Sequence, residues 1–301
     1  MRIIFLGTTG SYPTVRRNHP SIAIHRDSEL FLFDCGEGTQ RQMFRAKLGF
    51  CQKIFISHIH GDHILGIPGL LQTMSLLDVK KPLLVFGPKG IVDFVKAIMA
   101  TVKFKLTFPL ELREVSEGIV CIEKEYYVQA SFVDHGIPSL AYALVENERL
   151  GKFYQERAVS LGIPKGPLWS QLQHGKDVHL SDGNIISPGQ VLGPPRPGRK
   201  IVFSGDTRPC EAITKLAEKA DFLIYEATLS DELADKARES GHSTPSQGGR
   251  IAKEAKVKRL VLTHISPRYE DAQILLTQAK NVFPNTCLAE DLMEFEIPYL
   301  D

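Results

Sequence analysis

Four side chains that can bind a metal lie within six positions of one short segment, FISHIHGDHILG: His58, His60, Asp62 and His63. Imidazole nitrogen and carboxylate oxygen are preferred ligands of zinc. His58 and His60 are two residues apart and can converge on one ion, while Gly61 allows a tight turn that directs Asp62 and His63 toward a second. Because each zinc takes about four or five ligands, two ions require further donors from elsewhere in the chain.

Three later residues can supply those donors, because each follows a strand-like segment. The runs KIFISHIH, KIVFSGDT and RLVLTHIS are almost continuously apolar before their polar ends, which is typical of strands buried on both faces. Sites in layered α/β proteins form where such strands end. His135, Asp206 and His264 each have an ordinary explanation as loop residues, but together with the first segment they favour a two-metal site with a carboxylate able to bridge. Zinc is favoured by the histidines, and Mn²⁺ would also suit a carboxylate-bridged pair.

The remaining pattern of apolar runs and breaks predicts two sheets covered by helices, not one doubly wound sheet. Besides the three runs above, strands are predicted at Arg2–Leu6, Ser21–His25, Leu30–Phe33, Leu83–Phe86, Tyr126–Phe132, Leu140–Val145 and Met293–Ile297. Helices are predicted at Gly38–Lys47, Ile67–Leu77, Gly90–Met99, Ile213–Ala220, Ser246–Ala255 and Asp271–Val282. Thr244 followed by Pro245 is a start signal for the fifth of these helices.

Residues 151–177 interrupt this alternation and contain several basic residues and the only tryptophan. Their apolar content is too low for an element of the core, so we expect an arm or a lid. A solvated insertion without function is the alternative. A second basic loop, LGPPRPGRK, follows further along the chain.

Composition limits the class of protein. The 301 residues carry a formal net charge of +1, so any polyanionic partner must be bound by local patches. There is no apolar run of 18 residues, the N-terminus leads directly into a strand-like segment, and the five cysteines form no CxxC pair. We therefore expect a cytoplasmic protein that does not interact with a membrane.

The order HxHxDH, later His, SGDT and THIS resembles the metallo-β-lactamase superfamily and, within it, the short form of the tRNase Z family. The resemblance implies a four-layer αββα sandwich over residues 1–301, with residues 151–177 as an inserted tRNA-binding arm. It also implies two Zn²⁺ per subunit. The implied ligands are His58, His60 and His135 for one ion, Asp62, His63 and His264 for the other, and Asp206 between them.

Further motifs resemble the tRNase Z branch in particular. YEATL and GHSTPSQ correspond to motifs that imply a hydrogen-bonded pair of Glu226 and His242, although Tyr225 replaces the family's histidine. PTVRRNHPS resembles a loop that contacts the tRNA 3′ end, but Val15 stands in the position of its lysine, which leaves discrimination against CCA-ending tRNA open. GIPKGPL resembles the tip of the family's arm. The residues implied to bind substrate are Arg17, Asn18, Gly162, Pro164, Lys165, Gly166, Pro167 and Arg268.

The resemblance implies an endoribonuclease that removes the 3′ trailer from precursor tRNA, leaving a 3′-OH on the tRNA and a 5′-phosphate on the trailer. Asp62 would accept a proton from the attacking water, and His242, polarised by Glu226, would protonate the leaving oxygen. A homodimer is also implied, in which one subunit's arm holds the tRNA cut by the other. The alternatives are another hydrolase of this fold, acting on small phosphodiesters or thioesters, and a non-catalytic nucleic-acid-binding protein.

Overall fold

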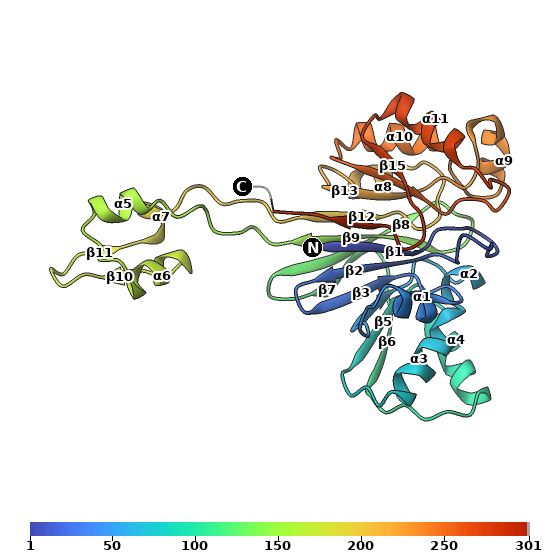
Figure 1. Cartoon of the computed structure of the whole chain (residues 1–301), viewed down its shortest axis with the longest axis horizontal. Coiled ribbons are helices and arrows are strands. Elements are labelled where there is room, and N and C mark those ends of the chain that lie inside the picture. Colours follow the sequence, from blue (N-terminus) through green and yellow to red (C-terminus); the bar gives the residue numbers. More distant parts are fainter. Residues whose placement is uncertain (300–301) are drawn as a thin grey trace. The chain divides into compact units, whose positions relative to one another are not determined.

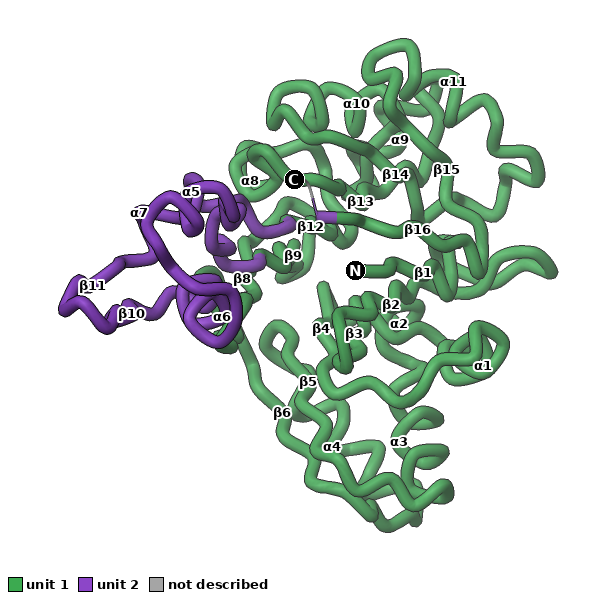
Figure 2. The backbone as a smooth tube through the Cα atoms, turned by 60° about the vertical axis from the view of Figure 1, so that its left-hand side comes forward, with its two compact units in different colours: residues 1–145, 200–298 green, residues 146–199, 299–301 purple. Residues whose placement is uncertain are grey.

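The computed structural model describes residues 1–299, which form two compact units (Figure 2). The larger unit comprises residues 1–145 and 200–298, and the smaller unit comprises residues 146–199 together with Tyr299. The predicted arm, residues 151–177, falls within the smaller unit. None of the helices formed by the described residues is both long enough and apolar enough to cross a bilayer.

Two seven-stranded sheets form the centre of the larger unit (Figure 1). The first sheet has, in spatial order, β16 (Glu294–Glu296), β1 (Arg2–Gly7), β2 (Ser21–Arg26), β3 (Glu29–Phe33), β4 (Lys53–Phe55), β5 (Leu83–Gly87) and β6 (Leu110–Glu114). The second has β15 (Thr286–Leu288), β14 (Leu260–Thr263), β13 (Phe222–Glu226), β12 (Lys200–Phe203), β9 (Ser139–Glu146), β8 (Tyr126–Val133) and β7 (Gly118–Ile122). Strands β3 to β6 are parallel, as are β12 to β15.

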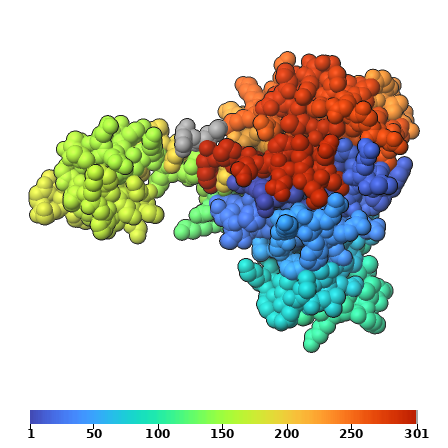
Figure 3. All heavy atoms as spheres, in the orientation of Figure 1, coloured from blue at the N-terminus to red at the C-terminus, as the bar shows by residue number. Residues whose placement is uncertain are grey.

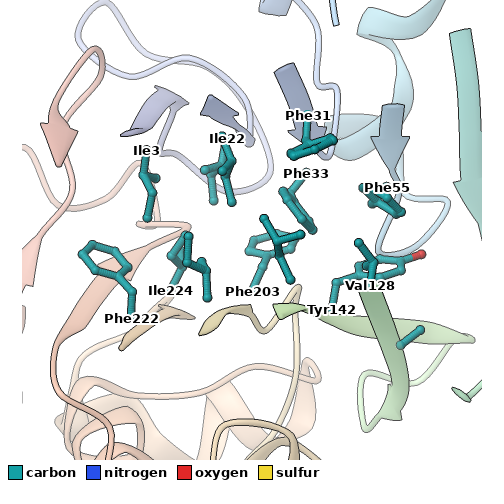
Figure 4. Packing of buried hydrophobic residues seen from close by; sticks show 14 of the residues in the cluster. Ile3, Ile22, Phe31, Phe33, Phe55, Val128, Tyr142, Phe203, Phe222 and Ile224 are labelled. Carbon is teal, nitrogen blue, oxygen red and sulfur yellow. The ribbon is translucent and has the colours of Figure 1, made fainter. Parts of the chain in front are cut away.

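Large apolar side chains fill the space between the two sheets (Figure 4). The rings of Phe33 and Phe55 stack with centroids 5.3 Å apart, and those of Phe55 and Phe86 stack at 4.9 Å. Tyr142 and Phe203 of the second sheet meet the ring of Phe33 edge-on. This packing fixes the two sheets against each other.

Helices cover the outer face of each sheet, which completes the four-layer αββα sandwich predicted from the sequence (Figure 1). The first sheet is covered by α1 (Thr39–Arg45), α3 (Gly66–Leu76) and α4 (Ile91–Thr101). The second is covered by α8 (Glu211–Leu216), α10 (Pro245–Glu254) and α11 (Gln273–Val282). The start of α10 is confirmed, since Thr244 and Gln247 form a capping box there.

All six predicted helices and the predicted strands are present, with ends shifted by a few residues. The sequence analysis does not predict β6, β7, β13 or β15, nor the short α2 (Gly61–Ile64), the turn η1 (Asp231–Leu233) or α9 (Ala234–Glu239). Strands β6 and β7 lie at the edges of their sheets and expose many of their side chains. The sequence of β6, LELRE, lacks the apolar signal of a buried strand, whereas that of β7, GIVCI, is an apolar run that the sequence analysis did not assign.

The smaller unit corrects one expectation, because it has a hydrophobic core of its own. Its atoms form the compact group coloured yellow-green in Figure 3. Its elements are α5 (Gln155–Ser160), α6 (Pro167–Gln173), β10 (Val178–His179), β11 (Ile185–Ile186) and α7 (Pro188–Val191). Trp169 and Leu172 pack there against Val178, Ile186 and Val191. The last three lie beyond residue 177, so the apolar content of residues 151–177 alone underestimates the core.

The strand that leads to the histidine segment is anchored to the opposite sheet. Strand β4 is fully buried, and the Tyr142 hydroxyl of β9 donates a 2.7 Å hydrogen bond to the carbonyl oxygen of Ile56. Ile56 precedes Ser57 and His58, so this bond holds the start of the segment across the interior of the sandwich.

We predict that Tyr142→Phe lowers the free energy of unfolding by about 1–3 kcal/mol, because the Ile56 carbonyl would stay buried without its donor. Urea unfolding measures the change. As a control, Tyr127→Phe removes a hydroxyl of the neighbouring strand that forms no hydrogen bond with described residues, and should change stability by less than about 0.5 kcal/mol. Equal losses in the two variants would contradict the anchoring role.

Candidate metal centre

The seven predicted ligands converge at one end of the sandwich, where strands of both sheets end. His58, His60 and His135 offer three ligand atoms within 4.8 Å of one another, and so do Asp62, His63 and His264. The Oδ2 atom of Asp206 lies between these two sets, 3.1 Å from His264 Nε2, 3.3 Å from His63 Nε2 and 3.7 Å from His58 Nε2. The structure brings both predicted sets together, and it also brings together residues of different sets, such as His58, His63 and Asp206.

The first set offers three ring nitrogens that a cation could share, because Nδ1 of His60 faces two nitrogens that carry no proton. Nδ1 of His135 donates to the Gly241 carbonyl (2.8 Å), and Nδ1 of His58 lies 2.9 Å from Ser57 Oγ, whose own proton goes to Asp34. A neutral imidazole donates through one nitrogen, so both Nε2 atoms carry lone pairs. They point at His60 Nδ1 from 3.0 and 3.2 Å. Nitrogens about 2.0–2.1 Å from one tetrahedral zinc are about 3.4 Å apart, close to these separations.

The second set fits a cation for a related reason. Nε2 of His63 and Nε2 of His264 are buried without a hydrogen-bond partner, although buried polar atoms are nearly always paired. The other ring nitrogens are occupied, by Asp34 Oδ2 at 2.6 Å and by Thr228 Oγ1 at 2.8 Å. Asp62 Oδ2 lies 3.6 Å from each bare nitrogen. A divalent ion held here would satisfy both histidines and the carboxylate.

Electrostatics keeps the central carboxylate ionised. Burial alone would raise the pKa of Asp206, but positive charge on the rings of His264, His63 and His58, which they carry when protonated, holds it well below its usual range. The pKa of Asp62 is likewise held below its usual range, since His264 and His63 outweigh the effect of burial. Both carboxylates are therefore available as anionic ligands.

Asp34, which the sequence analysis did not identify, orients candidate metal ligands through outer hydrogen bonds. It is fully buried, with φ of 59°, and its carboxylate accepts hydrogen bonds from the backbone and hydroxyl of Ser57 and from Nδ1 of His63. Such outer contacts fix the tautomer and direction of metal-binding histidines. The available signal was its position in FDCGEG, directly after β3, where it follows a buried strand as the predicted ligands do.

His242 and Glu226 form the predicted pair beside the metal ligands. Nδ1 of His242 lies 3.0 Å from Glu226 Oε1, and the ring lies 5.0 Å from that of His135. Glu226 is fully buried and also accepts hydrogen bonds from Thr207 and Thr228. Burial disfavours the imidazolium, but the Glu226 carboxylate outweighs it and raises the pKa of His242 to about 9.

Tyr225, the departure from the family motif, supports the turn that carries His242. Its buried hydroxyl lies 2.9 Å from Ser243 Oγ, and Ser243 in turn donates to the Thr207 carbonyl at 2.6 Å. Its ring packs so closely under Gly248 that a Cβ at this glycine would lie 2.9 Å away. Tyr225 is therefore a buried support for this turn and does not line the metal centre.

The N-terminal loop is held in place by two of the residues predicted to bind substrate. The Arg17 guanidinium donates to Thr8 Oγ1 and to the Ala289 carbonyl, both at 2.7 Å, and Asn18 Nδ2 donates to the Glu37 carbonyl at 2.9 Å. Ser11 N binds Asp62 Oδ2 at 2.8 Å, which links the loop to the metal centre. Beside the loop lies a pocket of about 450 Å³, whose lining includes Pro13, Thr14, Asn18, Glu37, Arg41 and Leu65.

The other predicted substrate-binding residues lie in two places. Arg268 is exposed, four residues after His264, and its Nε donates to Ser266 Oγ at 3.1 Å. The tip residues belong to the smaller unit, between α5 and α6, where Lys165 Nζ lies 5.7 Å from the centre of the Trp169 ring. Gly162 and Gly166 adopt φ of 69° and 139° there, conformations that favour glycine. The remaining tip residues are Pro164 and Pro167.

Known proteins of similar sequence and structure identify the family to which this chain belongs. Residues 171–265 match the β-lactamase superfamily domain, and residues 1–96 match the family of the anti-Pycsar protein Apyc1. Ribonuclease Z of Methanosarcina acetivorans is 51% identical and that of Methanosarcina mazei 48% identical, each alignment covering 99% of both chains. The crystal structure of human tRNase Z, short form, superimposes with a TM-score of 0.74 at 31% identity, covering 99% of this chain and 100% of that one. The chain therefore belongs to the ribonuclease Z family of the metallo-β-lactamase superfamily.

Proposed function

We propose that this protein is a metal-dependent endoribonuclease that removes the 3′ trailer from precursor tRNA, leaving a 3′-OH on the tRNA and a 5′-phosphate on the trailer. The observation that carries the proposal is the placement of His242, hydrogen-bonded to Glu226, beside two ligand sets that meet at Asp206. Full-length similarity to ribonuclease Z proteins supports the choice of substrate.

We assign two Zn²⁺ per subunit to the two ligand sets, with Mn²⁺ as a possible substitute. The first set would be His58, His60 and His135, the second Asp62, His63 and His264, with Asp206 shared. When bound, two such ions activate water and neutralise charge on the phosphoryl oxygens. The chain's own residues must then orient the water and handle the two proton transfers.

Asp62 is the residue that orients the attacking water and accepts its proton. Its Oδ2 atom is held by the backbone N–H of Ser11 and faces the bare nitrogens of His63 and His264. An ionised carboxylate in this position can take the proton that leaves as the phosphorus–oxygen bond forms.

His242 is the residue that protonates the leaving 3′ oxygen. Its Nδ1 is occupied by Glu226, so Nε2 is the nitrogen that remains for the substrate. Glu226 itself is fixed by Thr207 and Thr228, which gives the ring a defined direction. Glu226 is thus a positioning residue for this step.

Recognition of the tRNA body is assigned to the arm, through Gly162, Pro164, Lys165, Gly166 and Pro167, and recognition near the cut to the N-terminal loop and Arg268. Such contacts go to phosphates and ribose, which position an RNA without reading its bases. We also propose a cytoplasmic homodimer in which one subunit's arm holds the tRNA cut by the other. The five free cysteines are consistent with a reducing compartment.

A cleavage map tests the function directly. With zinc and a 5′-labelled precursor tRNA, the protein should make a single cut after the discriminator nucleotide. His63→Ala should lower the rate by more than about 100-fold, because even loss of an outer contact to a metal ligand costs about 10–100-fold. Circular dichroism of the variant checks that it is folded. If wild-type protein leaves the tRNA intact but hydrolyses a simple phosphodiester or thioester, the small-substrate hydrolase is the correct assignment.

The role of His242 as an acid can be separated from a structural role. His242→Ala should lose about 10²–10⁴-fold in cleavage rate on the natural substrate. On a substrate with sulfur in place of the bridging 3′ oxygen, the loss should fall below about tenfold, because a thiolate leaves without a proton. His25→Ala, in β2, is the control and should cleave both substrates normally. Equal losses of His242→Ala on the two substrates would refute the acid role.

Asp34→Ala should weaken metal binding and activity by about 10–100-fold, because Ser57 and His63 would lose the group that orients them. Metal content after dialysis against a graded zinc buffer measures the affinity. The matched control is Asp93→Ala, which removes an exposed carboxylate on α4 and should retain wild-type zinc affinity. An Asp34 variant that binds zinc as tightly as the wild type would show that the histidines are oriented without it.

A further inference from the structure

Two chain segments form the base of the smaller unit, residues 146–153 and 192–199, which we call the stalk. They pair as an antiparallel ribbon through bridges between Arg149 and Arg196 and between Phe153 and Leu192. The backbone hydrogen bonds include two of 2.8 Å between Arg149 and Arg196. A two-stranded ribbon is only marginally stable by itself. The order of the stalk must therefore come from additional contacts.

Tyr299 supplies such contacts from the far end of the sequence. The guanidinium carbons of Arg149 and Arg199 each lie 3.7 Å from the centre of its ring. At that distance a planar guanidinium lies over the face of a ring, an arrangement favoured both by stacking and by the attraction of a cation to the π electrons. Since Arg149 and Arg199 come from different segments of the stalk, one aromatic ring connects both strands.

A buried carboxylate completes the cluster. Glu146 accepts hydrogen bonds from Arg199 at both oxygens, from Nε at 2.7 Å and from a terminal nitrogen at 2.8 Å, and the Tyr299 hydroxyl donates to the same carboxylate at 3.2 Å. Paired, two-point contacts of this kind fix the direction of an arginine. The arginine that stacks on Tyr299 is therefore itself held rigidly.

The chain crosses from one unit to the other three times, and Tyr299 follows the third crossing. The chain passes between the units after Val145, before Lys200 and again after Pro298. The first two passages are the stalk strands, and the third places Tyr299 in the cluster. Tyr299 is a member neither of the candidate metal-ligand groups nor of the hydrophobic core cluster of the smaller unit. Its removal should therefore affect the stalk while leaving both of these intact.

We propose that Tyr299 is a positioning residue for tRNA, which orders the two stalk segments within the smaller unit, the unit that carries the arm. This inference rests on the proposed function of the arm. It predicts a defect that is specific to a substrate large enough to reach the arm. Hydrolysis of a small phosphodiester, which needs the metal centre alone, should not change.

The test compares full-length Tyr299→Ala and Tyr299→Phe with the wild type on precursor tRNA and on bis(p-nitrophenyl) phosphate. Tyr299→Ala should raise the KM for precursor tRNA about tenfold, because two cation–π contacts are lost, with kcat within about twofold of normal. Tyr299→Phe keeps both stacking contacts and loses the hydroxyl, so its KM should stay within about threefold of normal. Both variants should hydrolyse the small diester at the wild-type rate.

Hydrogen exchange gives a second readout that does not depend on the substrate. The amides of Arg149 and Arg196 should exchange at least about tenfold faster in Tyr299→Ala than in the wild type. Unchanged exchange at these amides, an unchanged KM for precursor tRNA, or an equal loss on both substrates would each overturn the inference. Failure of the proposed function looks different, because the wild-type protein itself would then leave precursor tRNA uncut.

Discussion

The crowding of bare imidazole nitrogens around Asp206 is the constraint on which the rest of the structure depends. The Nε2 atoms of His63 and His264 lie 3.3 and 3.1 Å from the Oδ2 atom of Asp206 and are buried without a hydrogen-bond partner, which is costly. The protein holds the rings there because the opposite nitrogens of His58, His63 and His264 are bound by Ser57, Asp34 and Thr228. A divalent cation between these nitrogens and the carboxylates would satisfy them, so the ligand sets fit a metal ion.

The candidate metal centre could be predicted from the sequence because its candidate ligands occur in short, local sequence patterns. Strands β4, β12 and β14 are recognisable as continuous apolar runs, and each is followed within three residues by a predicted ligand, His58, Asp206 or His264. Asp34 could not be assigned a role in the same way, since its importance lies in a left-handed backbone and in contacts to residues more than 20 positions away. The support that Tyr225 gives through Ser243 could not be predicted from the sequence either, because it depends on which face of β13 packs against the turn that carries His242.

The smaller unit shows a different limit of sequence reasoning. Its core is built from residues on both sides of position 177, so a boundary drawn from local composition divides the apolar residues that pack together. The stalk cluster is harder still to anticipate, since 153 residues separate Tyr299 from Glu146. The edge strand β6 is missed for a different reason, because it is polar at three of its five positions and carries little apolar signal.

In the proposed function the two units divide the work, which would explain how a chain of near-neutral charge can act on a polyanion. Most of the groups assigned to the metal centre are buried and bind one another, so they contribute little to attracting a distant RNA. Attraction and orientation are then assigned to exposed groups outside the centre, such as Lys165 in the smaller unit and Arg268, four residues after His264. Because the two sets of residues are separate, changes in the smaller unit can alter which RNA is held without disturbing the metal ligands.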